Sequence, residues 1–375
     1  MRSEPGEPTA EIVPATGVLI GPEERAAVDR VLASGMLAQG PEVAAFEAEF
    51  AATVDGRPCA AVNSGTSALL LGLLAAGIGQ GDEVIVPSFS FAATANAVAL
   101  AGATPVFADV DPQYLCLDPD AVLAAIGPRT AAIMPVHLYG HPAAMDRLGE
   151  IARRHGLALV EDAAQAHLAD LAGRPVGTFG EIAAFSFYPT KNMTCGEGGI
   201  VVCADEAVAR RVRLLRNQGM ERRYANEIVG YNARMTDLHA AIGRVQLRRL
   251  PGWTEQRRVN AAFLTAGLGE VAERAGLVLP AVAPEAGPVW HQYTVRAPER
   301  DRVVAAMAGV GVQTGVYYPT PIHRLPAYGL DLDLPVTAAA SREVVSLPVH
   351  PALTPAQRER VVTALTQAIE EAVAA

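Results

Sequence analysis

Short apolar segments alternate with helix-like segments between residues 83 and 161 of this 375-residue chain. The predicted strands are 83–86, 105–108, 130–136 and 157–161, and the predicted helices between them are 92–101, 119–126 and 143–155. A strand–helix unit that repeats in this way predicts a mainly parallel sheet with right-handed crossovers and helices on both faces. The alternation therefore predicts an α/β fold.

A lysine follows a further predicted strand at 182–187. Pro189 ends this strand, so Lys191 lies just beyond it, beside the glycine turn 196–199. A lysine in a desolvated cleft has a lowered pKa, and its neutral amine can form a Schiff base with a carbonyl group. A surface lysine in a loop is the alternative, and Lys191 taken alone does not exclude it.

Two acids, Glu161 and Asp162, end the strand that begins at residue 157. A carboxylate at the carboxyl end of a buried strand faces the crevice in which α/β sheets bind ligands. We therefore expect Asp162 to lie in that crevice. Capping of the alanine-rich turn that follows is the alternative role for Asp162.

The segment 63–68 is a turn of small residues that opens an apolar helix at 69–74. Backbone amides at a helix N-terminus bind anions, although an ordinary helix cap has the same composition. A lysine, an acid against the pyridine nitrogen and a phosphate cradle are the three groups that pyridoxal 5'-phosphate (PLP) requires. The glycines at 77–81 precede a strand instead of following one, which excludes a Rossmann dinucleotide loop.

The cradle, the acid and the lysine, in this order, resemble the sugar aminotransferases of the DegT/DnrJ/StrS type. These belong to the fold type I PLP enzymes of the aspartate aminotransferase superfamily. The segments 87–96, 135–140 and 230–237 resemble the same family, and the resemblance runs from about Pro22 to the C-terminus. It implies a large domain with a mainly parallel sheet flanked by helices, and a smaller α+β domain.

The resemblance also implies roles for individual residues. Lys191 would carry the imine and move the proton, Asp162 would contact the pyridine nitrogen, Phe91 would stack on the ring and Gln165 would contact its phenolic oxygen. The implied phosphate contacts are Gly65, Thr66, Ser67, Ser186 and, from the second subunit of a homodimer with shared active sites, Asn232. A turn residue is the alternative for Asn232.

Substrate contacts are predicted at Tyr188, Tyr317 and His323 from the same resemblance. Packing is the alternative for Tyr188. For His323, a structural role, with its hydrogen bonds made inside the fold, is an equal alternative. Phe89, two residues from Phe91 in an extended segment, is expected to pack in the core.

The function implied by the resemblance is transfer of an amino group from an amino acid, glutamate in the family, to a nucleotide-linked keto sugar in amino-sugar biosynthesis. A 4-keto deoxysugar is expected because this substrate type is common in the family. The alternatives are a 3-keto sugar or a keto-cyclitol, a PLP-dependent sugar dehydratase and a PLP-fold sensor without turnover. The dehydratases have histidine in place of the lysine, so Lys191 argues against that reaction.

Three parts of the chain are predicted. Residues 1–17 are rich in proline and glutamate and are expected to be poorly ordered. Residues 18–252 form the large PLP-binding domain, which the chain leaves near Pro251, between helices at 234–250 and 255–268. Residues 253–375 form the small C-terminal domain, with strands at 289–295 and 312–317, a helix at 301–309 and a last helix from Pro355.

Composition restricts partners and location. The net charge of −10 argues against a nucleic-acid surface. No apolar run is long enough to span a membrane, and the N-terminus does not have the pattern of a signal peptide. The four cysteines have no metal-ligand spacing, so no metal is expected, and they are expected to be reduced in a cytoplasmic protein.

Overall fold

A seven-stranded sheet forms the centre of the computed structural model, which describes residues 12–374. In the spatial order β1-β9-β8-β5-β4-β2-β3, only β9 runs antiparallel to its neighbours. The strands are β1 (Cys59–Val62), β2 (Glu83–Pro87), β3 (Thr104–Ala108), β4 (Thr130–Ile133), β5 (Ala158–Asp162), β8 (Ile182–Ser186) and β9 (Gly199–Cys203). The predicted α/β fold with a mainly parallel sheet is confirmed.

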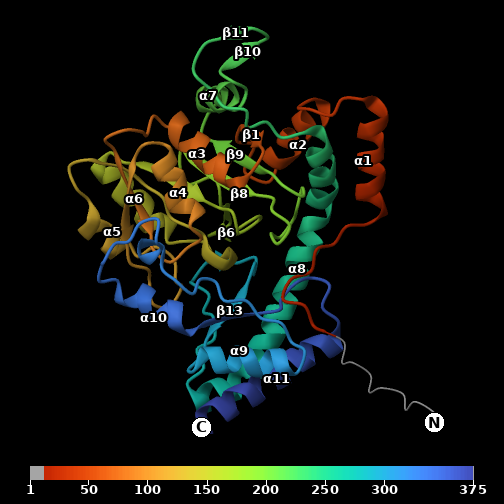
Figure 1. Ribbon diagram of the computed structural model, residues 1–375, viewed down its shortest axis with the longest axis vertical. Helices are drawn as coiled ribbons and strands as arrows, with labels where there is room; N and C mark the ends of the chain where they lie inside the picture. Colours follow the sequence, from red (N-terminus) through yellow and green to blue (C-terminus); the bar gives the residue numbers. More distant parts are fainter. Residues whose placement is uncertain (1–11, 375) are drawn as a thin grey trace.

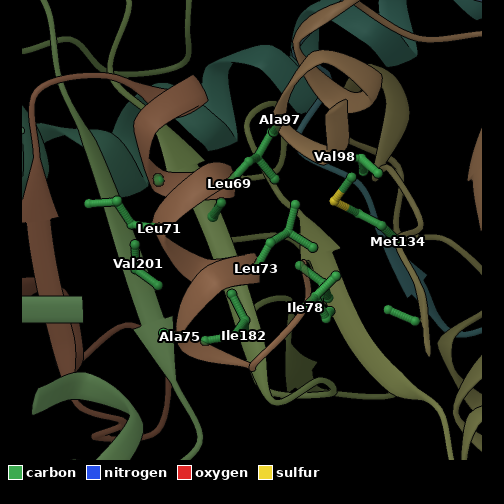
Figure 2. Close-up of a cluster of buried hydrophobic side chains, with 14 of the residues drawn as sticks. Leu69, Leu71, Leu73, Ala75, Ile78, Ala97, Val98, Met134, Ile182 and Val201 are labelled. Atoms are coloured by element: carbon green, nitrogen blue, oxygen red, sulfur yellow. The ribbon is translucent and has the colours of Figure 1, made fainter. Parts of the chain in front are cut away.

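Helices cover both faces of the sheet (Figure 1). The helices on one face are α3 (Gly65–Ala75), α4 (Ala93–Leu100) and α7 (Glu206–Arg216), and those on the other are α2 (Pro41–Ala51), α5 (Pro119–Ala125) and α6 (Met145–His155). Successive strand residues alternate between these layers, because side chains along a strand point to opposite faces. Ile182 packs under α3 with Val201, as Figure 2 shows, whereas Ala183 belongs to the apolar cluster on the opposite face.

One long helix, α8 (Asp237–Ala275), replaces the two helices predicted on either side of Pro251. It runs from the layers beside the sheet into the C-terminal part of the chain (Figure 1). The predicted break was wrong because proline removes only one hydrogen bond of the helix ladder. Buried side chains continue on both sides of it, with Leu250 before the proline and Thr254 and Arg257 after it.

The C-terminal part has its own apolar cluster, formed mostly by residues between 261 and 372. Its elements are β13 (Tyr293–Arg296), α9 (Arg300–Gly309), β14 (Val344–Leu347) and α11 (Pro355–Ala374), with β13 antiparallel to β14. The separate cluster is compatible with a second domain, and the domain boundaries stay a prediction. The strand predicted at 312–317 was wrong, because this segment forms only single bridges at Val312 and Gly315 before it enters the functional site.

The N-terminal segment differs in part from expectation. Residues 1–11 lie outside the described residues, but Val13 is fully buried in the C-terminal cluster. Its N–H donates to the Gly311 carbonyl at 2.9 Å, and its carbonyl accepts from the Gln313 N–H at 2.9 Å. The expectation of poor order was therefore wrong for 12–17, because backbone pairing and apolar burial hold this segment in place.

Shorter elements connect these layers. They are α1 (Pro22–Ser34), η1 (Leu138–Gly140), β6 (Asp170–Leu171), β7 (Arg174–Pro175), β10 (Met220–Arg222), β11 (Ala225–Asn226), β12 (Ala286–Gly287), η2 (Ile322–Arg324) and α10 (Pro335–Glu343). The β10–β11 hairpin projects beyond α7 at one end of the molecule (Figure 1). Across residues 12–374, no helix is long and apolar enough to cross a bilayer, and no group of three metal-ligating side chains is found.

Candidate active site

A pocket of about 730 Å³ lies where β5 and β8 end. This is the edge at which α/β sheets bind ligands, and the volume suits a cofactor together with a small substrate. The predicted site residues that line it are Gly65, Thr66, Phe91, Asp162, Gln165, Ser186, Tyr188, Lys191 and Tyr317. The fold therefore brings together residues that are up to about 250 positions apart in the chain.

Lys191 lies in the turn after β8, where its N–H donates to the Tyr188 carbonyl at 2.9 Å. It is the only lysine of the chain. Burial lowers the pKa of its ammonium group, and the negative charge of Asp162 acts in the opposite direction. The pocket therefore shifts Lys191 toward the neutral amine, which is the nucleophilic and proton-accepting form.

Asp162 is buried at the end of β5. Its Oδ2 accepts from the Thr94 hydroxyl of α4 at 2.7 Å, and its Oδ1 accepts from the Ala164 N–H at 3.2 Å. Burial raises the pKa of Asp162, although these hydrogen bonds and the charge of Lys191 oppose the shift. A buried carboxylate of this kind is stabilised by a cationic partner in the pocket.

The neighbouring acid, Glu161, points to the other face of β5. Its carboxylate accepts from the N–H groups of Gly177, Phe179 and Gly180 at 2.7–2.8 Å and pairs with His137 at 3.1 Å. All of these contacts are structural. The alternation of side chains along β5 therefore separates a pocket acid, Asp162, from a structural acid, Glu161.

The turn before α3 has the shape of an anion cradle. Ser64 caps the helix by accepting from the Ser67 N–H at 3.1 Å. The N–H groups of Gly65 and Thr66 have no hydrogen-bond partner among the described residues, and both residues line the pocket. A Cβ atom at Gly65 would lie 2.6 Å from the Ser186 Cβ, so only glycine lets this turn approach β8 so closely.

Ser67 does not line the pocket. Its hydroxyl lies 3.0 Å from the Ser64 hydroxyl, one turn into the helix, so the structure does not place it as a phosphate contact. Ser64 lines the pocket instead. The helix cap and the cradle are thus one structure, and the two alternatives considered for the turn do not exclude each other.

Gln165 is held on both sides of its amide. Its Oε1 accepts from the Tyr139 N–H at 2.7 Å, and its Nε2 donates to the Tyr318 hydroxyl at 3.2 Å. One Nε2 proton remains for a ligand, because an amide nitrogen carries two. Gln165 is therefore oriented with a donor available in the pocket.

Aromatic side chains form the mouth of the pocket. Phe91 is 58% exposed and lies 6.0 Å, between ring centroids, from Tyr318. Tyr188 is exposed, and Tyr317 is half-buried. Phe89 is buried in the core as expected, although side chains two apart in an extended segment share a side, and its ring also lies near Tyr318, at 6.4 Å between centroids.

Two other predicted residues lie outside the pocket. His323 is 1% exposed, and its Nδ1 lies 2.6 Å from the Ser88 hydroxyl, so the structure supports its structural alternative and not a substrate contact. Asn232 is exposed and bridges to Asn217 at the base of the β10–β11 hairpin. Within one chain, Asn232 therefore does not contribute to the pocket.

Comparison with known proteins gives the same family as the site. The pattern of the DegT/DnrJ/EryC1/StrS aminotransferase family matches residues 18–366. The chain belongs to this family.

Individual relatives are similar over nearly their whole length. The chain is 46% identical over 350 residues to the dTDP-3-amino-3,4,6-trideoxy-alpha-D-glucose transaminase of Streptomyces venezuelae, covering 92% of both chains. It is 48% identical over 342 residues to the erythromycin biosynthesis sensory transduction protein EryC1 of Saccharopolyspora erythraea, covering 90% of this chain and 92% of that protein. The crystal structure of S. venezuelae DesV in complex with a ketimine intermediate superposes with a TM-score of 0.90 at 46% identity, covering 93% and 94% of the two chains.

The protein is thus a PLP-dependent aminotransferase of fold type I. The residues of its pocket fit the cofactor. Asp162 is a buried acid that lacks a full cationic partner, the Gly65 and Thr66 amides are unpaired donors for a phosphate, and Lys191 is the only amine available.

Several residues of the aminotransferase pocket were missed by sequence reasoning. Thr94 lies within the segment 87–96 that resembles the family, so that segment carried a signal for it. Tyr318 is adjacent to the predicted Tyr317. His291 also lines the pocket, but a single histidine before a strand has no pattern that separates it from a core residue.

Proposed function

We propose that this aminotransferase transfers an amino group from glutamate to the C3 ketone of a dTDP-linked deoxysugar, in amino-sugar biosynthesis. The observation that carries the aminotransferase reaction is the shared pocket of Lys191, Asp162 and the Gly65–Thr66 cradle. The name of the 46% identical transaminase of Streptomyces venezuelae supports the C3 position, because an amine at C3 replaces a ketone at C3. The 4-keto sugar expected from the sequence becomes the second candidate.

The residues of the pocket divide the reaction between them. When bound, PLP supplies the electron sink and carries the amino group between the two substrates. In the first half-reaction, Lys191 Nζ accepts the proton from the α-carbon of the amino acid. In the second half-reaction, it donates a proton to the sugar carbon that carried the ketone. Asp162 supplies a fixed negative charge at the floor of the pocket, and Phe91 and Tyr188 cover its mouth with apolar surface that excludes water.

Product regiochemistry tests the substrate. The purified protein is given glutamate with either a dTDP-linked 3-keto or a dTDP-linked 4-keto deoxysugar, and the position of the new amine is read by NMR. We expect kcat/KM to be about 100-fold higher for the 3-keto sugar. A ketone at C4 instead of C3 would leave unpaired the polar groups of the pocket that bind the ketone.

Different outcomes separate the alternatives. Preference for the 4-keto sugar would overturn the C3 assignment, and reaction with glutamate but with neither sugar would overturn the substrate class. A protein that binds PLP but never reacts with glutamate would be a sensor, a role that the name of the EryC1 relative includes.

We also propose that the functional unit is a homodimer in which each active site receives Asn232 from the other subunit. The segment that carries Asn232 includes exposed apolar side chains, with Tyr224 82% and Val229 93% exposed. Such surface is typical of an interface. No arginine of the described residues lines the pocket, whereas the hairpin of this segment carries Arg222 and Arg223, so a partner could supply positive charge for anionic ligands.

Mixing two inactive variants tests the shared site. Lys191→Ala and Asn232→Asp chains are combined and re-equilibrated, and activity is measured. In a two-fold dimer, one site of each heterodimer then carries both changes and the other carries neither. Random exchange makes half of the dimers heterodimers, so about a quarter of wild-type activity should return.

Lys191→Ala mixed with Asp162→Asn is the matched control. Both of these residues act in their own chain, so each site of that heterodimer keeps one change and little activity should return. If subunit exchange is demonstrated and the first mixture stays inactive, the shared-site proposal is wrong.

A further inference from the structure

Two contacts fix the imidazole ring of His291, a residue that lines the active-site pocket. Its Nδ1 lies 3.1 Å from the Oδ1 of Asn192. Asn192 in turn donates from its Nδ2 to the Val289 carbonyl at 3.2 Å. A carbonyl only accepts, so this bond directs the amide nitrogen to Val289 and the amide oxygen to the imidazole. The proton of a neutral His291 is therefore on Nδ1, and Nε2 carries the lone pair.

The lone pair on His291 Nε2 is unpaired within the chain. No described residue, Lys191 included, forms a hydrogen bond with this atom. The atom is not sealed, however, whereas both ring nitrogens of the buried His167 are sealed without a partner. His291 is 6% exposed and lines the active-site pocket, so its Nε2 opens into that pocket.

The surroundings keep His291 neutral. Burial lowers its pKa well below the usual value, and the nearby groups Lys191, Arg257 and His167 lower it further. Arg257 also donates from its guanidinium to the carbonyls of Trp290 and His291, at 3.1 and 3.4 Å, which holds the backbone at this point. The imidazole thus presents a hydrogen-bond acceptor of fixed tautomer and fixed position to a ligand.

An atom that only accepts hydrogen bonds selects among the groups of the ligands. Ketone oxygens, carboxylates and phosphate groups of the substrates and the cofactor only accept at neutral pH. The amino group of glutamate donates, but it is the group that the reaction transfers. A hydroxyl group of the sugar is the donor that remains to pair with His291 Nε2.

The position of His291 indicates which hydroxyl group this is. Asn192, which contacts His291 Nδ1, directly follows Lys191 in the chain. The acceptor therefore lies in the part of the pocket where Lys191 meets the reacting carbon. For a ketone at C3, the hydroxyl groups nearest to the reacting carbon are those at C2 and C4.

We infer that His291 is a specificity-determining residue, whose Nε2 accepts a hydrogen bond from a sugar hydroxyl group on a carbon next to the ketone. A sugar without this hydroxyl group leaves the buried Nε2 unpaired in the complex, which weakens binding. The inference rests on the sugar class of the proposed function.

Binding of non-reacting sugars to the cofactor-loaded protein tests the inference. dTDP-6-deoxyglucose has a hydroxyl group at C3 in place of the ketone, and its 2-deoxy and 4-deoxy forms each lack one flanking hydroxyl group. Calorimetry gives the Kd of each sugar for wild type and two variants. His291→Asn keeps an amide donor for Asn192 and removes the acceptor at Nε2. His291→Gln is the matched variant, because its longer side chain can place an amide oxygen near the position of Nε2.

We expect one of the two deoxy sugars to bind wild type about tenfold more weakly than dTDP-6-deoxyglucose. In His291→Asn this difference should fall to within about twofold, and in His291→Gln it should return. KM for the keto sugar should rise about tenfold in His291→Asn, while KM for glutamate stays unchanged. Circular dichroism verifies folding, and His291→Leu, which also lacks an acceptor, replaces His291→Asn if that variant does not fold.

The outcomes separate this inference from the proposed function. If wild type binds the three sugars equally well, or if the preference is the same in all variants, His291 serves packing alone and the inference is wrong. If wild type binds none of them, the sugar class is wrong and the inference fails with it. If the predicted differences appear but the keto sugar is not aminated, the role of His291 stands and the proposed function fails.

Discussion

Lys191→Ala is expected to remove the visible absorbance of the cofactor-loaded protein and to lower turnover at least about 10⁴-fold, while the fold is retained. Lys191 is the only lysine of the chain, so no second side-chain amine can replace it in holding the cofactor covalently. The fold should survive because the side chain lies half-buried in a pocket and makes no ion pair within 4 Å among the described residues. Absorbance spectra and steady-state rates of the purified variant measure both effects.

Lys191→Arg is the matched control for the positive charge. A guanidinium is not deprotonated near neutral pH, so this variant keeps the charge beside Asp162 but has no neutral amine. We expect it to be as colourless and as inactive as Lys191→Ala. A visible band that persists in either variant would show that the cofactor is not held through Lys191.

Asp162→Asn is expected to keep the cofactor bound and to lose about 10²- to 10³-fold in turnover. The amide can still accept from Thr94, so the geometry at the end of β5 is preserved. It has no negative charge, however, and cannot keep a pyridine nitrogen protonated, which makes the ring a poorer electron sink. Cofactor content by absorbance, together with the rate of the glutamate half-reaction, separates binding from turnover.

Glu161→Gln is the matched control, because Glu161 is the adjacent acid on the opposite face of the strand. Removing its charge should weaken the contacts to His137 and to three backbone amides, and should cost about 3 kcal/mol of folding free energy. It should leave the spectrum of the bound cofactor unchanged. If Asp162→Asn instead keeps near-wild-type turnover, Asp162 serves only as a cap of the turn at Ala164, and its role against the cofactor is wrong.

Local patterns in the sequence were sufficient for strands β2, β3, β4, β5 and β8 and for the helices between them, whereas β1 was not predicted and the roles of the site residues came from the family resemblance. Apolar segments of strand length, broken by proline and glycine, predict strands because a buried parallel strand needs apolar residues on both faces. Asp162 and Lys191 each follow such a strand, and strands of a parallel sheet end at one edge. Asp162 and Lys191 therefore lie in one pocket because of the parallel topology, which the alternation of strands and helices predicts.

Tertiary packing decided the features that local patterns left open or made misleading. Pro251 predicts a helix end, but burial of side chains on both sides of it offsets the single hydrogen bond that it removes. The direction of the His323 side chain depends on Ser88, which is 235 residues away, so no local pattern separates a buried histidine from a ligand contact.

His291 shows the same limit for the site itself. Its tautomer depends on Asn192, 99 residues away. Burial and the neighbouring Lys191, Arg257 and His167 lower its pKa, and none of these residues is a neighbour of His291 in the sequence. The sequence by itself determined the residue types and the strand ends that carry the chemistry. Only the tertiary structure decided which side chains share the pocket and in which protonation state, because hydrogen bonding and desolvation depend on distances between atoms that the order of residues does not specify.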